Sequence, residues 1–272
     1  MHPIILDFGR ITVYSLWVFV SIGLVAAMVA FARLAQRNRV NIEPILQHSL
    51  FLFLSILVGA RVLFILTHLP LFFYDFDFSI RFFLGLISIW DQGLSFWGGA
   101  IGVVASLMYL AKKYDGDLEK WLDLLALAAL IGFSIGVVGT FLDGMNHGRE
   151  TILPWGMTFE SRAVKYAVPI HPVQLYALVY MTAITIFSFE LHKKLRMQTA
   201  GFISRYVVLL YALFRFLEEF FRGDDTIMIA GIIRLPQVLA LFVSYFMARH
   251  IAKKYSLSLK DVLNPYRILT TL

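Results

Sequence analysis

The chain has 272 residues, of which 59% are hydrophobic and only 15% are charged, and its mean hydropathy is +0.75. A water-soluble domain of this length does not carry that balance, so the composition excludes an ordinary soluble protein. Cysteine is absent, which excludes disulfides, thiolate metal sites and a cysteine nucleophile within the chain. Lys and Arg outnumber Asp and Glu by 24 to 18, but basic loops that orient a membrane protein explain this excess without a nucleic-acid partner.

Apolar stretches long enough to cross a bilayer, about 20 residues each, recur along the chain. They cover approximately 13–32, 48–68, 94–111, 122–142, 172–190, 202–221 and 230–248. No polar stretch is long enough to form a separate soluble domain, and the first ten residues lack the basic start of a cleavable signal peptide. The sequence therefore predicts an all-α integral membrane protein, residues 1–272 forming a single polytopic domain with seven transmembrane helices.

Basic residues gather after every second predicted span. They are Arg33, Arg37 and Arg39, then Lys112, Lys113 and Lys120, then Lys193, Lys194 and Arg196, and finally Arg249, Lys253 and Lys254. Because basic loops stay in the cytoplasm, this pattern predicts an outside N-terminus and a cytoplasmic C-terminus. The two longest loops, about 69–90 and 143–171, then face outside, and the Phe- and Leu-rich first one is predicted to lie flat in the interface.

Charged residues interrupt the apolar segment YALFRFLEEFFRGDD, residues 211–225. Arg215, Glu219 and Arg222 are spaced so that one helix face would carry all three, with Glu218 about 100° away from Glu219. Ionisable groups in hydrocarbon cost a few kcal/mol or more, so these should face protein or water. They form either an ion-pair ladder with Arg222 reaching the interface, or a cationic patch whose guanidinium groups bind phosphate.

Arg61 is a second unusual charge, inside the second predicted span. Gly59 and Ala60 next to it permit close helix approach. Two spans with intramembrane arginines predict one shared anion site formed by Arg61 and Arg215. In the fourth span, small residues also favour close packing, at Gly132, Gly136 and Gly139.

The fifth span begins with the polar segment IHPVQLYA, residues 170–177. Pro172 suits the first turn of a helix. His171, Gln174 and Tyr176 are either binding residues or an interfacial anchor. Aromatic residues near other predicted span ends, namely Tyr14, Trp17 and Trp155, could equally belong to an aromatic belt.

Six segments, in this order, resemble the phosphatidylglycerol–prolipoprotein diacylglyceryl transferase family. They are LDFGRITVYSLW, VGARVLF, WDQGLSFWGGAIG, DGMNHGRETILPWGMTF, IHPVQLY and FRFLEEFFRGDD, and the similarity runs from residue 7 to about 237. The resemblance implies a bacterial cytoplasmic (inner) membrane protein with its active face outside. It also implies transfer of a diacylglyceryl group from phosphatidylglycerol to the lipobox cysteine of a prolipoprotein, with release of glycerol phosphate.

The resemblance and the charge pattern together suggest roles for individual residues. The candidate catalytic residues are Arg215, Glu219, Tyr14 and His147, with Glu219 expected to orient an arginine. The candidate substrate-binding residues are Arg61, Arg222, Asp91, Ser95, Trp97, Gly148, Arg149, His171, Gln174, Tyr176 and Gln237. Arginines would stabilise the departing phosphate, and a base would deprotonate the acceptor thiol. Asp91 could instead cap the following helix. The expected partners are phosphatidylglycerol, the prolipoprotein and the bilayer, with no metal, cofactor or nucleic acid.

Several polar residues of the family pattern are replaced in this chain. Trp97 stands where the family has His, Val137 where it has Arg, and Thr140 where it has Asn, while Asp143 and Met145 replace Asn and Glu of the outer loop. An indole cannot act as a base, because its N–H only donates, so Trp97 is expected to line the lipid cavity.

The replacements leave three explanations open. His147 could replace the missing base, the chain could act on a different lipid or acceptor, or it could bind anionic phospholipid without catalysis. A transporter or channel is a further alternative, because intramembrane charges also mark those proteins. Paired broken helices in two similar halves, typical of transporters, are not evident in the sequence.

Overall fold

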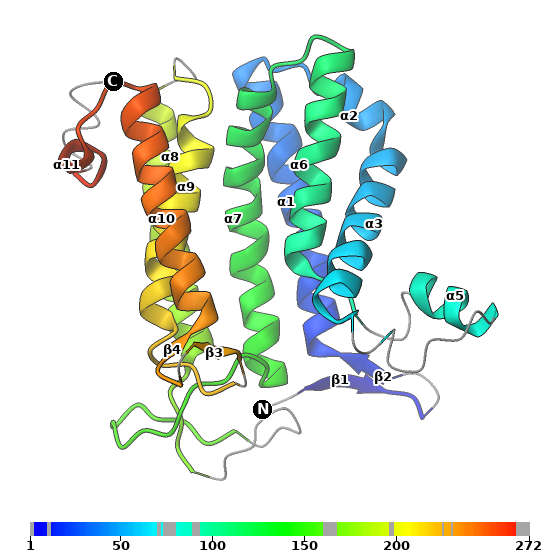
Figure 1. Ribbon diagram of the computed structural model, residues 1–272, viewed down its shortest axis with the longest axis vertical. Coiled ribbons are helices and arrows are strands. Elements are labelled where there is room, and N and C mark those ends of the chain that lie inside the picture. Colours follow the sequence, from blue (N-terminus) through cyan, green and yellow to red (C-terminus); the bar gives the residue numbers. More distant parts are fainter. Residues whose placement is uncertain are drawn as a thin grey trace. The chain divides into compact units, whose positions relative to one another are not determined.

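The computed structural model describes residues 3–9, 12–69, 72, 80–88, 93–159, 168–195, 199–224, 226–229 and 231–264. The described chain is mostly helical (Figure 1). It divides into two compact units, one formed by Met1–Asn38 with Leu122–Leu272 and the other by Arg39–Trp121. The single domain expected from the sequence stays a prediction.

Each apolar stretch predicted as a span overlaps with one long helix. These helices are α1 (Ser15–Asn38), α3 (Ser49–Thr67), α6 (Phe96–Lys113), α7 (Leu118–Asp143), α8 (Val173–Leu195), α9 (Phe202–Glu218) and α10 (Leu235–Lys254). Five of them, α1, α3, α7, α8 and α10, are long and apolar enough to cross a membrane. A mostly helical membrane protein is therefore confirmed, while the seven spans and their orientation stay predictions.

The long helices carry large apolar side chains on their outer surfaces. In α1, for example, Trp17 is 66% exposed, Leu24 is 62% exposed and Met28 is 63% exposed. Contiguous apolar surface of this kind is unfavourable in water. This apolar surface is compatible with contact to lipid acyl chains.

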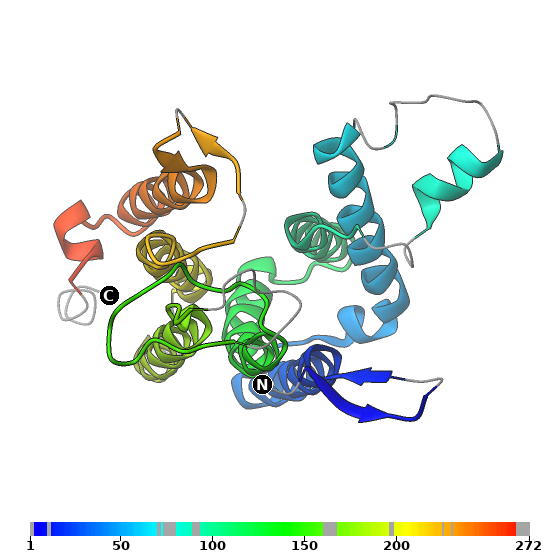
Figure 2. The same ribbon diagram turned by 90° about the horizontal axis from the view of Figure 1, so that it is seen from below.

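The larger unit holds α1, most of α7, and the helices α8, α9 and α10. Helix α9 packs between α8 and α10, which Figure 2 shows nearly end-on. In α7, a Cβ on Gly132 would lie 2.8 Å from the carbonyl oxygen of Gly23 in α1, and a Cβ on Gly139 would lie 2.8 Å from Cβ of Phe19. Close packing is confirmed at these two glycines. It is wrong for Gly136, where a Cβ would meet nothing within 4 Å.

A buried carboxylate fixes the start of α9. Asp123 of α7 is 1% exposed and accepts hydrogen bonds from the backbone N–H groups of Gly201 and Ser204, each at 2.7 Å. These N–H groups belong to the first turn of a helix, which has no backbone acceptors of its own. The position of α9, whose other end carries the charged residues, is thus fixed against α7.

The smaller unit is a pair of closely packed helices with short attachments, α2 (Glu43–Gln47) and α5 (Ile80–Ile87). Helices α3 and α6 approach so closely that a Cβ on Gly59 would lie 2.4 Å from the carbonyl oxygen of Gly98, and a Cβ on Gly102 would lie 2.2 Å from that of Ser55. The close approach predicted for Gly59 is confirmed, because the absent side chains let the two backbones touch.

The structure also contains short strands, and the all-α prediction missed them. Strands β1 (Ile4–Asp7) and β2 (Thr12–Tyr14) form one antiparallel hairpin, and β3 (Met228–Ile229) pairs with β4 (Ile233–Arg234) in another. A short helix, α11 (Leu259–Val262), follows α10. The loop after α7 forms isolated antiparallel bridges, Glu150 and Met157 each pairing with Ile170, and Gly148 pairing with Arg222. This last bridge joins the loop to the end of α9.

Candidate functional site

Six charged side chains meet where α9 ends and α10 begins. This charge network consists of Arg215, Glu218, Glu219, Arg222, Asp224 and Arg234. Three guanidinium groups face three carboxylates, so the formal charges of the network cancel. The sequence-predicted residues Arg215, Glu219 and Arg222 are therefore brought together by the fold.

Helix α9 ends before the chain reaches the other charged residues of the network. Helix α9 ends at Glu218, and the N–H of Phe221 donates to the carbonyl of Glu218 at 2.9 Å in a turn. The prediction that one helix face carries Arg222 together with Arg215 is therefore wrong. After the turn, Gly223 N–H donates to the carbonyl of His147 at 3.0 Å, so the backbone pairs with the loop instead of continuing the helix.

Glycines make this pairing possible. A Cβ on Gly148 would lie 2.2 Å from the carbonyl oxygen of His171, and a Cβ on Gly223 would lie 2.5 Å from that of Gly148. A larger residue at position 148 would clash with the backbone just before α8, and one at position 223 would push the loop away from the end of α9. Gly148 thus acts in the structure by permitting close backbone approach.

Every carboxylate of the network contacts two arginines or more. Arg215 pairs with Glu218 and, at 2.5 Å, with Glu219. Arg222 donates two hydrogen bonds to Asp224, at 2.8 and 2.5 Å, and lies within 3.4 Å of Glu218 and 3.7 Å of Glu219.

Arg234, from the start of α10, closes the network. It donates to Glu219 at 2.7 Å and to Asp224 at 3.1 Å. Its guanidinium also donates to the backbone carbonyls of Arg222 and Asp224.

Burial differs among the arginines. The side chain of Glu219 is fully buried, and those of Arg222 and Arg234 are 8% and 14% exposed, whereas the side chain of Arg215 is 23% exposed. Removing one partner of a buried ion pair is strongly destabilising, because the other charge is left without compensation. Arg215 is the most accessible cation of the network, while Arg222 and Arg234 lie inside it.

The Arg222–Asp224 pair stays ionised. Burial alone would lower the pKa of the Arg222 guanidinium, but its hydrogen bonds and charge attraction to Asp224 outweigh this and raise that pKa. Burial alone would raise the pKa of the Asp224 carboxyl, but the hydrogen bonds and the charge of Arg222 lower it. Two parallel hydrogen bonds between opposite charges produce this mutual stabilisation.

Neutral polar groups extend the network on both sides. The Tyr180 hydroxyl donates to Glu218 at 2.6 Å, and Arg222 donates to the Asn146 side chain at 2.9 Å. Gln237, a predicted binding residue, accepts a hydrogen bond from the backbone N–H of Arg234 at 3.1 Å in the first turn of α10.

A second cluster of aromatic and polar residues lies beside the network, at the start of α8. The ring Nδ1 of His171 lies 3.1 Å from the Tyr176 hydroxyl, which also accepts a hydrogen bond from the Trp155 indole at 2.8 Å. Phe221, one residue before Arg222, stacks edge-on against His171. The backbone of Arg149 bonds on one side to Phe221 and on the other to His171, which connects the cluster to the network.

His171, Arg149 and Gln174 differ in charge and burial. Burial and the nearby positive charge of Arg149 lower the pKa of His171, so its imidazole is neutral at pH 7. Arg149 itself is exposed, and no carboxylate among the described residues pairs with it. Gln174 is 2% exposed and donates to the carbonyl of Met145 at 2.7 Å, so it positions the loop.

The remaining predicted residues of the larger unit are Tyr14 and His147. Tyr14 ends β2, pairs with Ile4 in the hairpin and is 45% exposed. His147 is 5% exposed, and its carbonyl accepts the Gly223 N–H. The catalytic roles proposed for both residues stay predictions.

The smaller unit holds Arg61, Ser95 and Trp97. Arg61 is 7% exposed and donates to the backbone carbonyls of residues 85, 86 and 93 at 2.5 to 2.9 Å. Ser95 caps α6 by accepting a hydrogen bond from Gly98 N–H. Trp97 is 62% exposed, and Asp91 lies outside the described residues. The shared anion site of Arg61 and Arg215 stays a prediction.

Sequence reasoning missed two members of the network, Arg234 and Asp224, and the neutral groups Asn146 and Tyr180 that extend it. One signal was present for Arg234, because an arginine directly before Leu-Pro stands at the start of the last apolar stretch. Within the described ranges, no group of three or more His, Asp or Glu side chains is arranged to hold a metal ion.

The fold and the site together define a class, a helical membrane protein with buried arginine–carboxylate pairs and a histidine–tyrosine cluster at the ends of its helices. Comparison with known proteins is more specific. The family model described as prolipoprotein diacylglyceryl transferase matches residues 3–252. The chain belongs to this family, and the resemblance inferred from its motifs is confirmed.

Individual relatives carry the same description. A phosphatidylglycerol–prolipoprotein diacylglyceryl transferase of Geobacter sulfurreducens is 29% identical over 244 residues, covering 88% of this chain and 90% of the relative. One of Blochmanniella floridana is 28% identical over 282 residues, covering 93% of this chain and 96% of the relative. One of Aeromonas hydrophila is 34% identical over 174 residues, covering 64% and 60%.

Proposed function

We propose that the chain transfers the diacylglyceryl group of phosphatidylglycerol to the cysteine thiol of a prolipoprotein lipobox and releases glycerol phosphate. The observation that carries this proposal is the family match, which extends over residues 3–252. Relatives covered over nearly their whole length are named for the same donor and acceptor.

The protein would work as one domain in the bacterial inner membrane. Helices α1, α3, α6, α7, α8, α9 and α10 would form seven spans, with the N-terminus, the loops 69–90 and 143–171 and the charge network outside, and the C-terminus in the cytoplasm. Basic residues after alternate spans support this orientation.

The absence of native cysteine makes the orientation easy to test. Ile152→Cys places one thiol at a fully exposed loop position, and Lys113→Cys places one at the predicted cytoplasmic end of α6. A membrane-impermeant maleimide should label the first variant in intact cells and the second only after the cells are opened. The reverse pattern would refute the orientation.

The phosphate of the donor would bind at accessible arginines near the two clusters. Arg215 is the most exposed guanidinium of the network, and Arg149 is an exposed cation without a described carboxylate partner. Phosphate accepts bidentate hydrogen bonds from guanidinium groups. Glu218 and Glu219 would hold Arg215 in position, and Arg222 and Arg234 would keep these two carboxylates paired from inside the network.

The reaction forms one bond and breaks another. The acceptor thiol gives its proton to a base, the sulfur attacks the glycerol carbon, and the carbon–oxygen bond to phosphate breaks. The electron pair leaves on the phosphate oxygen, where arginine stabilises the added charge. The chain needs no cysteine of its own, because the nucleophile belongs to the acceptor.

Two histidines compete for the role of base. His171 is neutral at pH 7, as a base must be. His147 lies in the same loop, between α7 and α8. His171→Gln and His147→Ala should separate them, because the base is the residue whose loss lowers the rate of thioether formation while leaving donor binding intact. If His147→Ala leaves turnover unchanged, His147 is not the base.

A lipid-binding protein with an altered reaction is the second candidate. Trp97 replaces the family histidine, and the network arginines are already neutralised by carboxylates. Purified protein in phosphatidylglycerol proteoliposomes with a lipobox peptide distinguishes the two. Glycerol phosphate release with a matching mass gain on the peptide cysteine supports transfer. Phosphatidylglycerol binding without either product supports the second candidate, and ion flux through the same vesicles would indicate a transporter or channel.

A further inference from the structure

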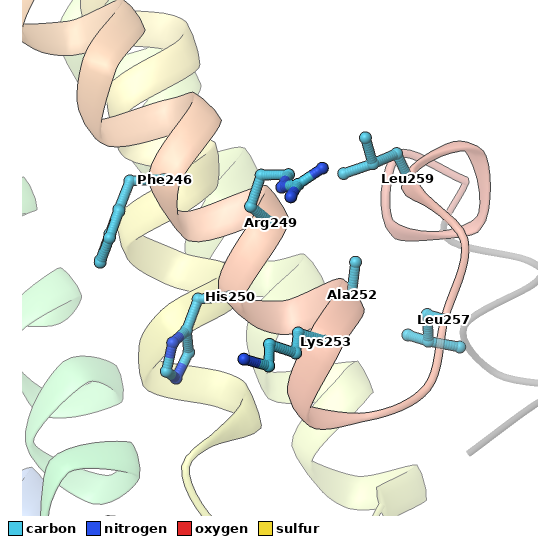
Figure 3. Close-up of a pocket in the computed structure, with 7 residues that line it drawn as sticks. All are labelled: Phe246, Arg249, His250, Ala252, Lys253, Leu257 and Leu259. Atoms are coloured by element: carbon cyan, nitrogen blue, oxygen red, sulfur yellow. The ribbon is translucent and has the colours of Figure 1, made fainter.

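A pocket of about 500 Å³ lies where α10 ends and α11 begins. Apolar walls come from Phe246, Leu257 and Leu259, and polar groups come from Arg249, His250 and Lys253 (Figure 3). The α10 residues of the pocket stand 12 to 19 positions after Arg234, so at a rise of about 1.5 Å per residue they lie about 18–28 Å from it along the helix. It is therefore separate from the charge network.

The pocket differs from the charge network in its charge balance. Among the described residues, no carboxylate pairs with Arg249 or Lys253. Asp261, the nearest acidic residue in the sequence, accepts a hydrogen bond from the Ser258 hydroxyl at 2.6 Å and does not line the pocket. A pocket with uncompensated positive charge favours an anionic ligand.

An apolar stripe leads away from the pocket along α10. The rings of Phe242, Phe246 and His250 follow each other at i, i+4 and i+8, with centroids 6.4 and 6.3 Å apart. Phe242 is 66% exposed and Phe246 is 54% exposed, on a helix that is long and apolar enough to cross a membrane. A free phosphate ion would make no use of this stripe, but an acyl chain would pack against it.

We propose that the pocket binds the phosphate of an anionic phospholipid, whose acyl chain lies along Phe242 and Phe246. Arg249 and Lys253 would donate to the phosphate oxygens, as basic side chains at the end of a membrane helix do for anionic headgroups. Arg249 and Lys253 stand at i and i+4, so both leave the same face of α10. In Figure 3, the Arg249 side chain extends toward Leu259 and the Lys253 side chain toward His250, so both would turn toward each other to bind one phosphate. This lipid is bound and not consumed, at the opposite end of α10 from the proposed transfer site.

Native mass spectrometry of the purified full-length protein tests the proposal. The probes are dioleoyl phosphatidylserine, which is anionic but lacks the glycerol headgroup of the proposed donor, and zwitterionic dioleoyl phosphatidylcholine. The wild type should bind more phosphatidylserine. Arg249→Gln/Lys253→Gln should lose roughly fivefold in affinity for each basic side chain removed, and Phe246→Ala should also weaken lipid binding while keeping the charges.

The matched control is Lys112→Gln/Lys113→Gln, which removes two basic residues from the last turn of α6. This variant should bind phosphatidylserine like the wild type. Three results would each overturn the proposal. They are equal losses in both double variants, equal binding of the two lipids by the wild type, and displacement of phosphatidylserine by millimolar inorganic phosphate. The measurement contains no acceptor peptide, so a failed transfer assay would leave its outcome unaffected.

Discussion

Arg234 offers the sharpest test of the charge network, because sequence spacing does not link it to the other members. Its guanidinium contacts Glu219 at 2.7 Å and Asp224 at 3.1 Å, and its own side chain is 14% exposed. Arg234→Met keeps the length and apolar stem of the side chain and removes the charge. The variant therefore isolates the ion pairs from the packing of the stem.

The expected cost follows from what remains after the substitution. Losing one partner of a buried ion pair costs about 3–5 kcal/mol when the other charge is left alone. Here Glu219 keeps Arg215 at 2.5 Å, and Asp224 keeps its two hydrogen bonds to Arg222. We therefore expect a loss near the lower limit, about 3 kcal/mol, which corresponds to a fall in Tm of roughly 6–12 °C.

Thermal unfolding in detergent, followed by tryptophan fluorescence, measures this fall. Arg249→Met is the matched control, since it removes an arginine from the same helix where no described carboxylate pairs with it. The control should change stability by no more than about 0.5 kcal/mol. Glu219→Gln combined with Arg234→Met should cost less than the sum of the single changes, because the two side chains contact each other. Equal effects of Arg234→Met and Arg249→Met would refute the network as described.

Four further substitutions test other parts of the structure. Gly98→Leu should lower Tm sharply, because a Cβ there would lie 2.2 Å from the Gly59 carbonyl, whereas Gly136→Ala should not, because nothing lies within 4 Å. Tyr180→Phe should cost about 2 kcal/mol by denaturant unfolding, through loss of the hydrogen bond to buried Glu218. The lowered pKa of His171 means that only the unfolded chain binds its proton as the pH first falls below about 6.5, so folded stability decreases there. His171→Gln should flatten this decrease in Tm measured from pH 7 to 5, and an unchanged slope would contradict it.

The long helices were predictable because the bilayer imposes a single strong requirement, a long apolar segment. The small hairpins were not predictable, because strands of two to four residues are too short to show a period-two pattern. Glycine spacing predicted close packing correctly at Gly59, Gly132 and Gly139. It failed at Gly136, because a glycine alone does not show whether another helix lies opposite it.

The site was predictable where contacts are local in sequence. Arg215 and Glu219 pair at i and i+4, as helical spacing requires. The helix end was missed, because LEEFFRG contains no stop signal before Gly223. Arg234 pairs with a residue 15 positions earlier, through a turn and a hairpin whose geometry no sequence period encodes.

The positive and negative charges of the network cancel, so a bound phosphate would have to compete with its carboxylates. An incoming phosphate would compete with Glu218 and Glu219 for Arg215. If Arg215 turns toward the ligand, Glu218 keeps the Tyr180 hydroxyl and Arg222, and Glu219 keeps Arg234.

No carboxylate is then left without a partner, so the large cost of an isolated buried charge does not arise. Arg222 lacks this freedom, because its side chain is only 8% exposed and holds Asp224 by two hydrogen bonds, at 2.8 and 2.5 Å. We infer that Arg215 is the exchangeable cation of the site, and that the redundant pairing by Arg222 and Arg234 allows it to bind a phosphate without unfolding the end of α9.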